Sequence, residues 1–147
     1  MYEFVITGRV KIMNIENDTC YLNLKSEMSL VLTQDIIDHI KSDVTGLICT
    51  RMEDVRGIIL YGSCARGDYS PDSDIDIAVL IDENRSLSDT ITETLSSIAT
   101  ELAMKYFAVV NCIFIPYNEY LEKKAWYPFY RNIAKEGDIL YGTEVLR

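Results

Sequence analysis

Apolar residues recur along this chain with two different periods, and each change of period marks the border of an expected element. Between Leu30 and Met52 they follow three- and four-residue steps, which is typical of one amphipathic helix. From Ile75 to Ile81 every second residue is β-branched, which indicates a strand whose two faces differ. A second helical stripe runs from Leu87 to Tyr106. The whole pattern predicts helices near residues 30–52, 86–106, 118–124 and 127–136, and strands near 57–61, 75–81, 107–115 and 139–141.

Two segments fall outside this pattern of long helices and strands. Residues 63–73 are rich in Ser, Gly, Asp and Pro, and are therefore expected to form a loop. Residues 2–12 and 20–24 are short β-like runs separated by a turn-forming stretch. We therefore expect residues 1–29 to form a β-like appendage and residues 30–147 to form one domain.

The composition is that of an ordinary globular protein with a strongly acidic balance. Hydrophobic residues make up 48% of the 147 positions and charged residues 25%, and 14 Lys and Arg against 23 Asp and Glu give a net charge of −9. This balance argues against non-specific binding of polymeric nucleic acid and against docking on an anionic membrane, because both depend on basic side chains. It does not exclude a phosphate-bearing ligand, since bound metal ions can invert the local charge.

The sequence also suggests a compartment. Its apolar runs fall far below the roughly 18 residues of a membrane span. The first ten residues include Glu3 and Arg9 without a basic leader or a cleavage site, so we expect no signal peptide. The four cysteines lie far apart with no Cys-x-x-Cys pair, and we expect free thiols rather than disulfides. The expected location is cytoplasmic.

One stretch concentrates residues that can carry chemistry. A hydrophobic strand ends at Gly62-Ser63, and after ten intervening residues a new strand opens with Asp74 and Asp76. Alternation along a strand places both carboxylates on one face, close enough to ligate a hard cation such as Mg²⁺. Gly62 lets the backbone approach a phosphate without a Cβ in the way. Ser63 can offer its N–H and hydroxyl to terminal phosphates.

This spacing also constrains the topology. If Gly62-Ser63 and Asp74 face one triphosphate, strands 57–61 and 75–81 should be antiparallel neighbours with the loop across their shared end. The helix of about twenty residues that follows suits a parallel crossover to the strand at 107–115. We therefore expect the middle strand to have one antiparallel and one parallel neighbour.

These residues resemble a known family, the minimal nucleotidyltransferase domains of the DNA polymerase β superfamily. The resemblance extends over roughly residues 30–142 and implies an α+β nucleotidyltransferase fold with a mixed sheet flanked by helices. The matching residues are Gly62-Ser63, Ala65-Arg66-Gly67, Ser73 and Asp74-x-Asp76.

The resemblance further implies an activity and a set of site residues. A nucleoside triphosphate, ATP in particular, would bind with Mg²⁺ and give up its nucleotidyl group with release of pyrophosphate. Asp74 and Asp76 would hold the metal. Many minimal members are antitoxins that adenylylate a helical HEPN-type partner, which makes such a partner protein a candidate acceptor. The candidate nucleotide-binding residues are Gly62, Ser63, Arg66 and Ser73.

One position departs from the family pattern. The family's third carboxylate lies in a later strand, and its best counterpart here is Asn111, within residues 110–113. An Asn oxygen can coordinate a metal, but the amide is uncharged and cannot accept a proton. The candidate catalytic residues are Asp74, Asp76 and Asn111. A second possibility is that Glu119 supplies the third carboxylate from the next loop. The alternative interpretation is a nucleotide-binding or partner-binding module with impaired catalysis.

Two structural alternatives stay open at this point. Arg66 either neutralises phosphate or pairs with Asp68 or Asp72. Six aromatic residues between Tyr117 and Tyr130 either pack the terminal helices onto the sheet or form a protein interface, where Tyr and Trp are enriched.

Overall fold

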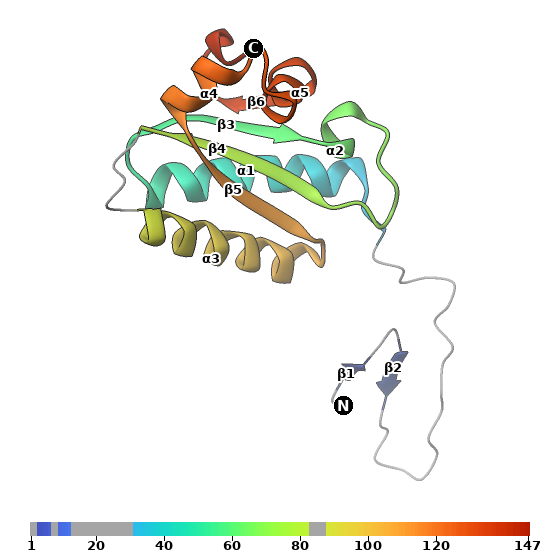
Figure 1. Cartoon of the computed structure of the whole chain (residues 1–147). Coiled ribbons are helices and arrows are strands. Elements are labelled where there is room, and N and C mark those ends of the chain that lie inside the picture. Colours follow the sequence, from blue (N-terminus) through green and yellow to red (C-terminus); the bar gives the residue numbers. More distant parts are fainter. Residues whose placement is uncertain (1–2, 7–8, 13–30, 83–87) are drawn as a thin grey trace. The chain divides into compact units, whose positions relative to one another are not determined.

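A computed structural model divides the chain into two compact units, Met1–Val31 and Leu32–Arg147 (Figure 1). The residues that the structure describes are 3–6, 9–12, 31–82 and 88–147.

The first unit contains a two-stranded antiparallel sheet. β1 (Glu3–Ile6) pairs with β2 (Arg9–Ile12), and Glu3 lies opposite Ile12. The single β-like run predicted over 2–12 is therefore two strands, and a glycine, which rarely continues a strand, stands between them in the sequence. The run expected at 20–24 lies outside the described residues.

The second unit is built on a four-stranded sheet with the order β5-β4-β3-β6. β4 (Ile75–Ile81) runs antiparallel to β3 (Val55–Tyr61) and parallel to β5 (Val110–Pro116), and β6 (Asp138–Tyr141) runs antiparallel to β3. α3 (Ser88–Tyr106) connects the two parallel strands. The α+β class, the mixed sheet and both predicted neighbours of the middle strand are confirmed.

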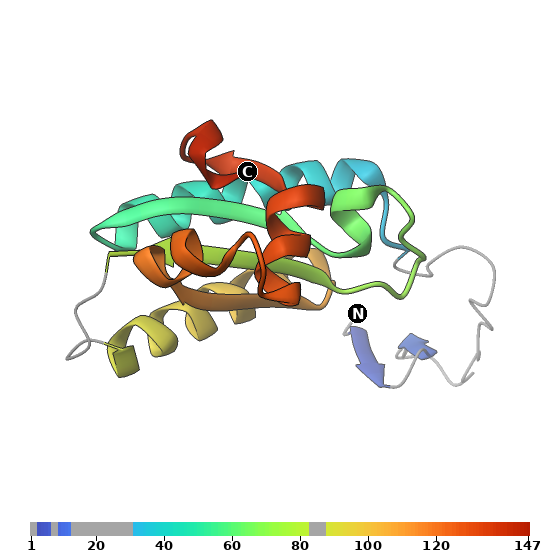
Figure 2. The same ribbon diagram turned by 45° about the horizontal axis from the view of Figure 1, so that its top comes forward.

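Helices cover both faces of this sheet (Figure 2). α1 (Gln34–Arg51) and α3 pack on one face, and α4 (Tyr117–Lys123) and α5 (Pro128–Glu136) pack on the other. α1 begins a few residues later than predicted, because the Thr33 hydroxyl accepts a hydrogen bond from the N–H of Ile36 at 3.4 Å and caps the helix there. Within the described residues, no helix combines the length and the apolarity needed to cross a membrane.

Two predicted boundaries are wrong. The segment 63–73 is not all loop, since it opens with a short helix, α2 (Ser63–Arg66), which ends at Gly67 in the left-handed conformation. The third strand of the prediction begins at Val110 rather than at residue 107. Phe107 has a φ of +52° and turns the chain out of α3 before the strand can start.

β4 separates two hydrophobic cores, because its alternate residues face opposite sides of the sheet. Ile77 and Val79 are fully buried in the core formed with α1 and α3, together with Leu95. Ala78 and Leu80 are equally buried in the second core, beneath α4 and α5.

Tyr120 holds the C-terminal segment in place. Its ring is fully buried, and its hydroxyl donates to the carbonyl oxygen of Leu146 in η2 (Glu144–Leu146) at 2.7 Å. Tyr130 is buried in the same core, so the packing interpretation is correct for these two aromatic residues. Trp126, by contrast, is 62% exposed.

Gly137→Ala should destabilise the fold, whereas Gly46→Ala should stabilise it. A Cβ built at Gly137 would lie 2.4 Å from the carbonyl oxygen of Ile133 and 2.5 Å from Cγ2 of Ile59. Because backbone cannot yield easily, we expect the free energy of unfolding to fall by about 1–3 kcal/mol. Gly46 is exposed within α1 with nothing within 4 Å of such a Cβ, so alanine there should add about 0.5–1 kcal/mol. Urea unfolding checks the pair, and effects of the same sign would contradict it.

Candidate active site

The candidate site lies at the end of the sheet where β3 ends and β4 begins. The register places Tyr61 opposite Asp76 between β3 and β4, and Asp76 opposite Asn111 between β4 and β5. These residues form one row across three strands, on the face that carries α4 and α5. Asp74 immediately precedes β4 and lies two residues before Asp76.

Asp74, Asp76 and Asn111 are brought into contact there. Nδ2 of Asn111 donates to Oδ1 of Asp76 at 3.0 Å and to Oδ2 of Asp74 at 3.4 Å. Because one amide reaches both carboxylates, the two carboxylates converge on one point. Asp74 and Asn111 are exposed and Asp76 is half-buried, so that point is open to solvent.

Gly62 connects β3 to α2 in a conformation that almost no other residue adopts. Its φ is +77° and its ψ is −157°, a region available essentially to glycine alone. A Cβ built on it would lie 3.0 Å from Oδ2 of Asp76. Glycine at this position therefore makes the sharp connection and also leaves room for the carboxylate. Ser63, the first residue of α2, follows directly.

Cys64 and Ser73 hold the connection between α2 and β4. The thiol of Cys64 donates to the carbonyl oxygen of Asp74 at 3.3 Å, and burial raises the pKa of this thiol, which favours its neutral form. The hydroxyl of Ser73 accepts a hydrogen bond from the N–H of Ser70 at 2.8 Å and closes a turn. The first carboxylate is thus fixed through its own backbone.

Arg66 joins α2 to the C-terminal part of the chain. Its Nε lies 3.2 Å from Oδ2 of Asp68, and its Nη1 lies 3.4 Å from Oε2 of Glu136 in α5. The hydrogen bond to Asp68, followed by the charges of Asp68 and Glu136, raises the pKa of Arg66. One of the pairings considered from the sequence, that with Asp68, is therefore present. The pairing with Glu136 was not expected, because nothing local in the sequence relates the two residues.

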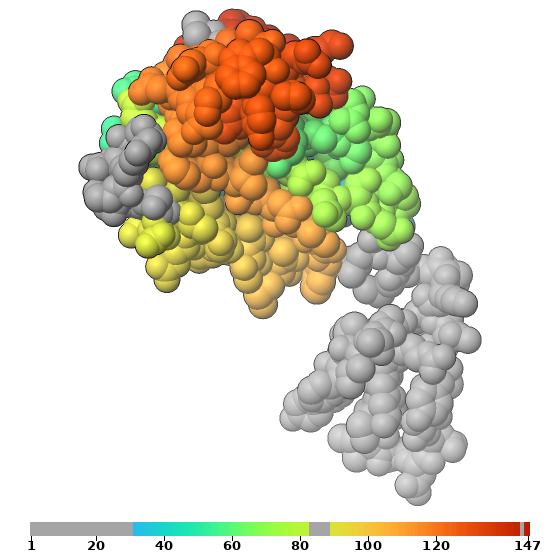
Figure 3. Space-filling view, in the orientation of Figure 1, coloured from blue at the N-terminus to red at the C-terminus, as the bar shows by residue number. Residues whose placement is uncertain are grey.

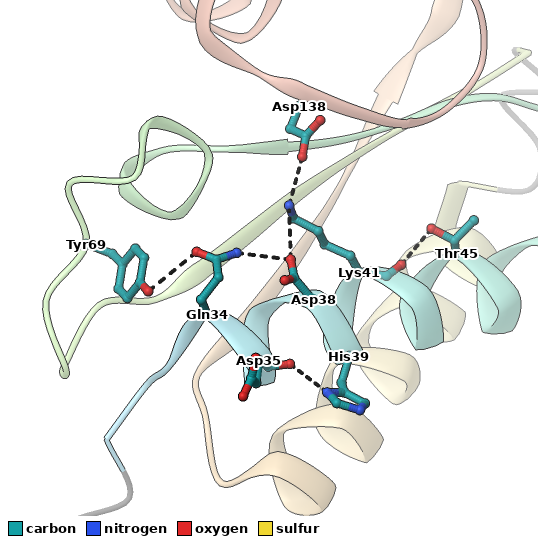
Figure 4. Close-up of polar contacts among 8 residues, drawn as sticks. All are labelled: Gln34, Asp35, Asp38, His39, Lys41, Thr45, Tyr69 and Asp138. Atoms are coloured by element: carbon teal, nitrogen blue, oxygen red, sulfur yellow. Dashed lines mark hydrogen bonds and ion pairs between the residues drawn. The ribbon is translucent and has the colours of Figure 1, made fainter.

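A polar network links the loop after α2, and also β6, to the start of α1 (Figure 4). The hydroxyl of Tyr69 donates to Oε1 of Gln34 at 3.5 Å, and Nε2 of Gln34 donates to Oδ1 of Asp38 at 3.0 Å. Lys41 lies between Asp38, at 3.5 Å, and Asp138 of β6, at 2.9 Å. These contacts tie together three segments that are far apart in the sequence.

Tyr61 is a site residue that the sequence analysis missed. Its ring meets that of Phe129 edge-on, with centroids 5.6 Å apart. Burial, and then the charge of Asp76, raise the pKa of Tyr61 to about 12, so its hydroxyl stays protonated at neutral pH. The only sequence signal for this position is its place directly before Gly62.

Glu119 does not fill the gap left by the third carboxylate. Asn111 lies near the start of β5, whereas Glu119 lies in α4, beyond the end of that strand at Pro116. From Asn111 to Pro116, β5 spans about 16 Å. Oε1 of Glu119 instead accepts hydrogen bonds from Lys123 at 3.0 Å and from Tyr130 at 3.1 Å.

The donor set fits a hard cation that shares its shell with a ligand. Mg²⁺ is usually bound through one or two carboxylates and keeps its other positions for water and phosphate oxygens. Asp74 and Asp76 supply two converging carboxylates, and a half-turn of the Asn111 amide would present its oxygen beside them. In the described part of the chain, no group of three or more His, Cys, Asp or Glu could hold a metal alone. The remaining ligands would have to come from the substrate.

The chain belongs to the polymerase β nucleotidyltransferase family. The family described as "Polymerase beta, Nucleotidyltransferase" matches residues 46–144, which include every residue of the candidate site. A protein of Methanocaldococcus jannaschii, named as an inferred protein adenylyltransferase, is 36% identical over 108 residues, which cover 74% of this chain and 93% of its own length. A second protein of the same organism and the same description is 32% identical over 79 residues, covering 54% and 75% of the two chains.

Solved structures show the same fold. Two structures of variants of a toxin–antitoxin complex, MntA-HpeT, superpose on this chain. One gives a TM-score of 0.51 at 24% identity, over 71% of this chain and 73% of the other. The second gives a TM-score of 0.50 at 19% identity, over 71% and 74%. These likenesses confirm the nucleotidyltransferase fold.

If the site holds Mg·ATP, Gly62→Ala should abolish its binding, whereas Gly67→Ala should preserve it. Both glycines have a positive φ, +77° and +79°, so alanine strains the backbone at either position. Only at Gly62 would the added Cβ meet a carboxylate, since nothing lies within 4 Å of one at Gly67. The thermal shift caused by Mg·ATP measures binding in each variant. Loss of the shift in Gly67→Ala as well would show that strain alone, and not the displaced Asp76, explains the effect.

Proposed function

We propose that residues 30–147 act as a minimal, Mg²⁺-dependent nucleotidyltransferase that transfers AMP from ATP to an acceptor hydroxyl. The observation that carries the proposal is the convergence of Asp74 and Asp76 directly beside the Gly62-Ser63 connection. Two carboxylates at the start of one strand and a glycine-serine turn at the end of its antiparallel neighbour give a place for metal-bound phosphates that neither feature gives alone. Family membership supports the reaction class.

Each site residue has a role in this proposal. Asp74 and Asp76 hold the metal, whose positive charge, when bound, offsets the charge of the phosphates. Ser63 orients the terminal phosphates, and Gly62 lets them approach the backbone. Arg66 adds positive charge nearby, since a guanidinium paired with two carboxylates still has N–H groups to donate. The Ser73 hydroxyl acts through the loop that it closes.

The reaction is a single displacement at the α-phosphorus of ATP. The acceptor oxygen forms a bond to that phosphorus, and the bond from phosphorus to the oxygen that bridges the α- and β-phosphates breaks. Pyrophosphate leaves with the electron pair, and the hydroxyl proton passes to water, because the amide of Asn111 cannot accept it. The products are the adenylylated acceptor, pyrophosphate and one proton.

Asn111 favours a second candidate function, a nucleotide-binding or partner-binding module with impaired catalysis. General-base catalysis typically contributes about 10²–10⁴-fold to a rate, and an asparagine in the third position forgoes it. Acceptors with acidic hydroxyls, such as tyrosine, need that base least. The two candidates therefore differ in rate, while the nucleotide site is common to both.

A protein is the acceptor class that we propose. Relatives named as inferred protein adenylyltransferases support it, because one of them matches this chain over 93% of its own length. A helical HEPN-type partner in a toxin–antitoxin pair, acting in the cytoplasm, is the specific acceptor we propose.

The first test measures AMP transfer. The full chain is incubated with α-labelled ATP, Mg²⁺ and the purified protein encoded by the neighbouring gene, and label on that protein is the expected result. Asp74→Asn and Asp76→Asn should each lower transfer by at least about 10²-fold, because each removes a charged metal ligand. Asp68→Asn is the matched control and should retain activity, since Asp68 pairs with Arg66 outside the carboxylate pair. A parent chain that binds Mg·ATP without any transfer would favour the impaired module.

The variant Asn111→Asp distinguishes an active nucleotidyltransferase from the impaired module. It should also change the stability of the fold in a way that depends on metal. It replaces an amide that donates at 3.0 and 3.4 Å to two carboxylates with a third negative charge. Without metal, the free energy of unfolding should fall by about 1–3 kcal/mol. Mg²⁺ should reverse this loss, and thermal unfolding in EDTA and in Mg²⁺ measures it.

The same Asn111→Asp variant also reports on catalysis. We expect AMP transfer to rise, because the new carboxylate can accept the proton of the acceptor hydroxyl. A variant whose stability is the same in EDTA and in Mg²⁺ would contradict a metal site at these residues.

A further inference from the structure

The order of the strands determines the side from which an acceptor reaches the site. In an in-line displacement the attacking and leaving oxygens lie on opposite sides of the phosphorus. In the proposed function the terminal phosphates bind at Gly62-Ser63, which follows β3, and the carboxylates lie at the start of β4. Because pyrophosphate departs on the side of β3, the acceptor must approach from the side of β5.

β5 forms the edge of the sheet on that side, as Figure 1 shows. An open cavity of about 530 Å³ surrounds Asn111 at this edge. Its lining runs from Tyr61 and Asp76 on one face of the sheet to Ser96 and Ala99 of α3 on the other. A substrate seated at Asn111 therefore has open surface around the strand edge as far as α3.

An apolar groove continues from this cavity along α3. It has a volume of about 620 Å³ and shares Ala99 and Val110 with the first cavity. Three of its lining side chains are strongly exposed, with Met104 at 73%, Phe107 at 69% and Val109 at 56%. Figure 3 shows the C-terminal half of α3 and the start of β5 together on the surface that faces the viewer. We call this surface the edge groove; it is lined by Ala99, Ala103, Met104, Phe107, Val109 and Val110.

Phe107 is both exposed and strained. It follows α3 directly with a φ of +52°, the left-handed conformation that glycine usually adopts at the end of a helix. A bulky side chain in this region carries a conformational cost. Phe107 is therefore a large apolar side chain that is exposed beside the groove at a strained position of the backbone.

We propose that the edge groove is the docking surface for the acceptor protein, an inference that rests on the proposed function. Its occupant presents a large apolar side chain close to the hydroxyl that receives AMP. Three observations select this occupant: the groove continues the catalytic cavity, its lining residues are uncharged, and it lies on the acceptor side of the in-line path. The chain's net charge of −9 favours a partner whose net charge is positive.

Phe107→Ser in the full chain tests the docking surface. The protein encoded by the neighbouring gene serves as the acceptor, and calorimetry measures its Kd while the thermal shift reports Mg·ATP binding. We expect the Kd for the acceptor to rise about tenfold or more, with Mg·ATP binding unchanged. Tyr141→Ser is the matched control, since Tyr141 is 45% exposed on β6 at the opposite edge of the sheet, and it should change neither quantity.

Phe107→Gly adds a test in which binding and stability move in opposite directions. Glycine relieves the left-handed strain, so Tm should rise by about 1–4 °C, while acceptor affinity falls as in Phe107→Ser. A loss of affinity caused by general damage to the fold would come with a lower Tm instead.

The possible outcomes separate this inference from the proposed function. An unchanged acceptor Kd in Phe107→Ser, or no acceptor binding by the parent, would overturn the docking surface. A parent chain that is a dimer in solution, with a Phe107→Ser variant that is a monomer, would also overturn it. That result would assign the groove to a second copy of the chain. A fall in Tm in Phe107→Gly would show that the Phe107 side chain stabilises the fold, and would overturn its assignment to the docking surface. Acceptor binding that depends on Phe107 without AMP transfer would overturn the proposed function and leave the docking surface standing.

Discussion

The alternation of side chains along β4 is the constraint on which the rest of the structure depends. One set of alternate residues lies in the core with α1 and α3, and the other set lies in the core with α4 and α5. Asp76 belongs to the second set, and the next residue of that set is the fully buried Ala78. A slip of one residue in register would move the carboxylate to the face of α1 and α3, and the isoleucines to the face of α4 and α5. The same packing that stabilises the sheet therefore fixes the position of the site.

The site follows from how β4 begins. Its neighbours differ in direction, so that β3 ends and β5 starts at the end of the sheet where β4 also starts. Polar groups from all three strands therefore meet without any long loop to carry them. Gly62 completes this arrangement, because a side chain there would meet the carboxylate of Asp76. The backbone contacts of Cys64 and Ser73 then limit how far the first carboxylate can move.

Much of this could be predicted from local pattern, and the exceptions share one physical cause. The strand periods and the spacing from Gly62 to Asp74 were enough to predict the antiparallel and parallel neighbours of β4. The register of β5 then places Asn111 beside both aspartates, which agrees with its match to the family's third carboxylate. The ion pair of Arg66 with Glu136 could not be predicted, because it depends on how α5 packs on the sheet. The exposure of Phe107 likewise depends on which surfaces the other elements leave uncovered.

The asparagine in the third position changes the energetics of the site as well as its chemistry. Three carboxylates that converge without a cation repel one another, so such a site depends on metal for its shape. An amide that donates to both aspartates holds them together when no metal is bound. In the proposed reaction such a site is pre-organised for its ligand, but Asn111 provides no base at the edge strand β5, where the acceptor would approach. If the chain transfers AMP as proposed, the choice of acceptor depends on what docks at that edge, and the proton of the acceptor hydroxyl passes to water.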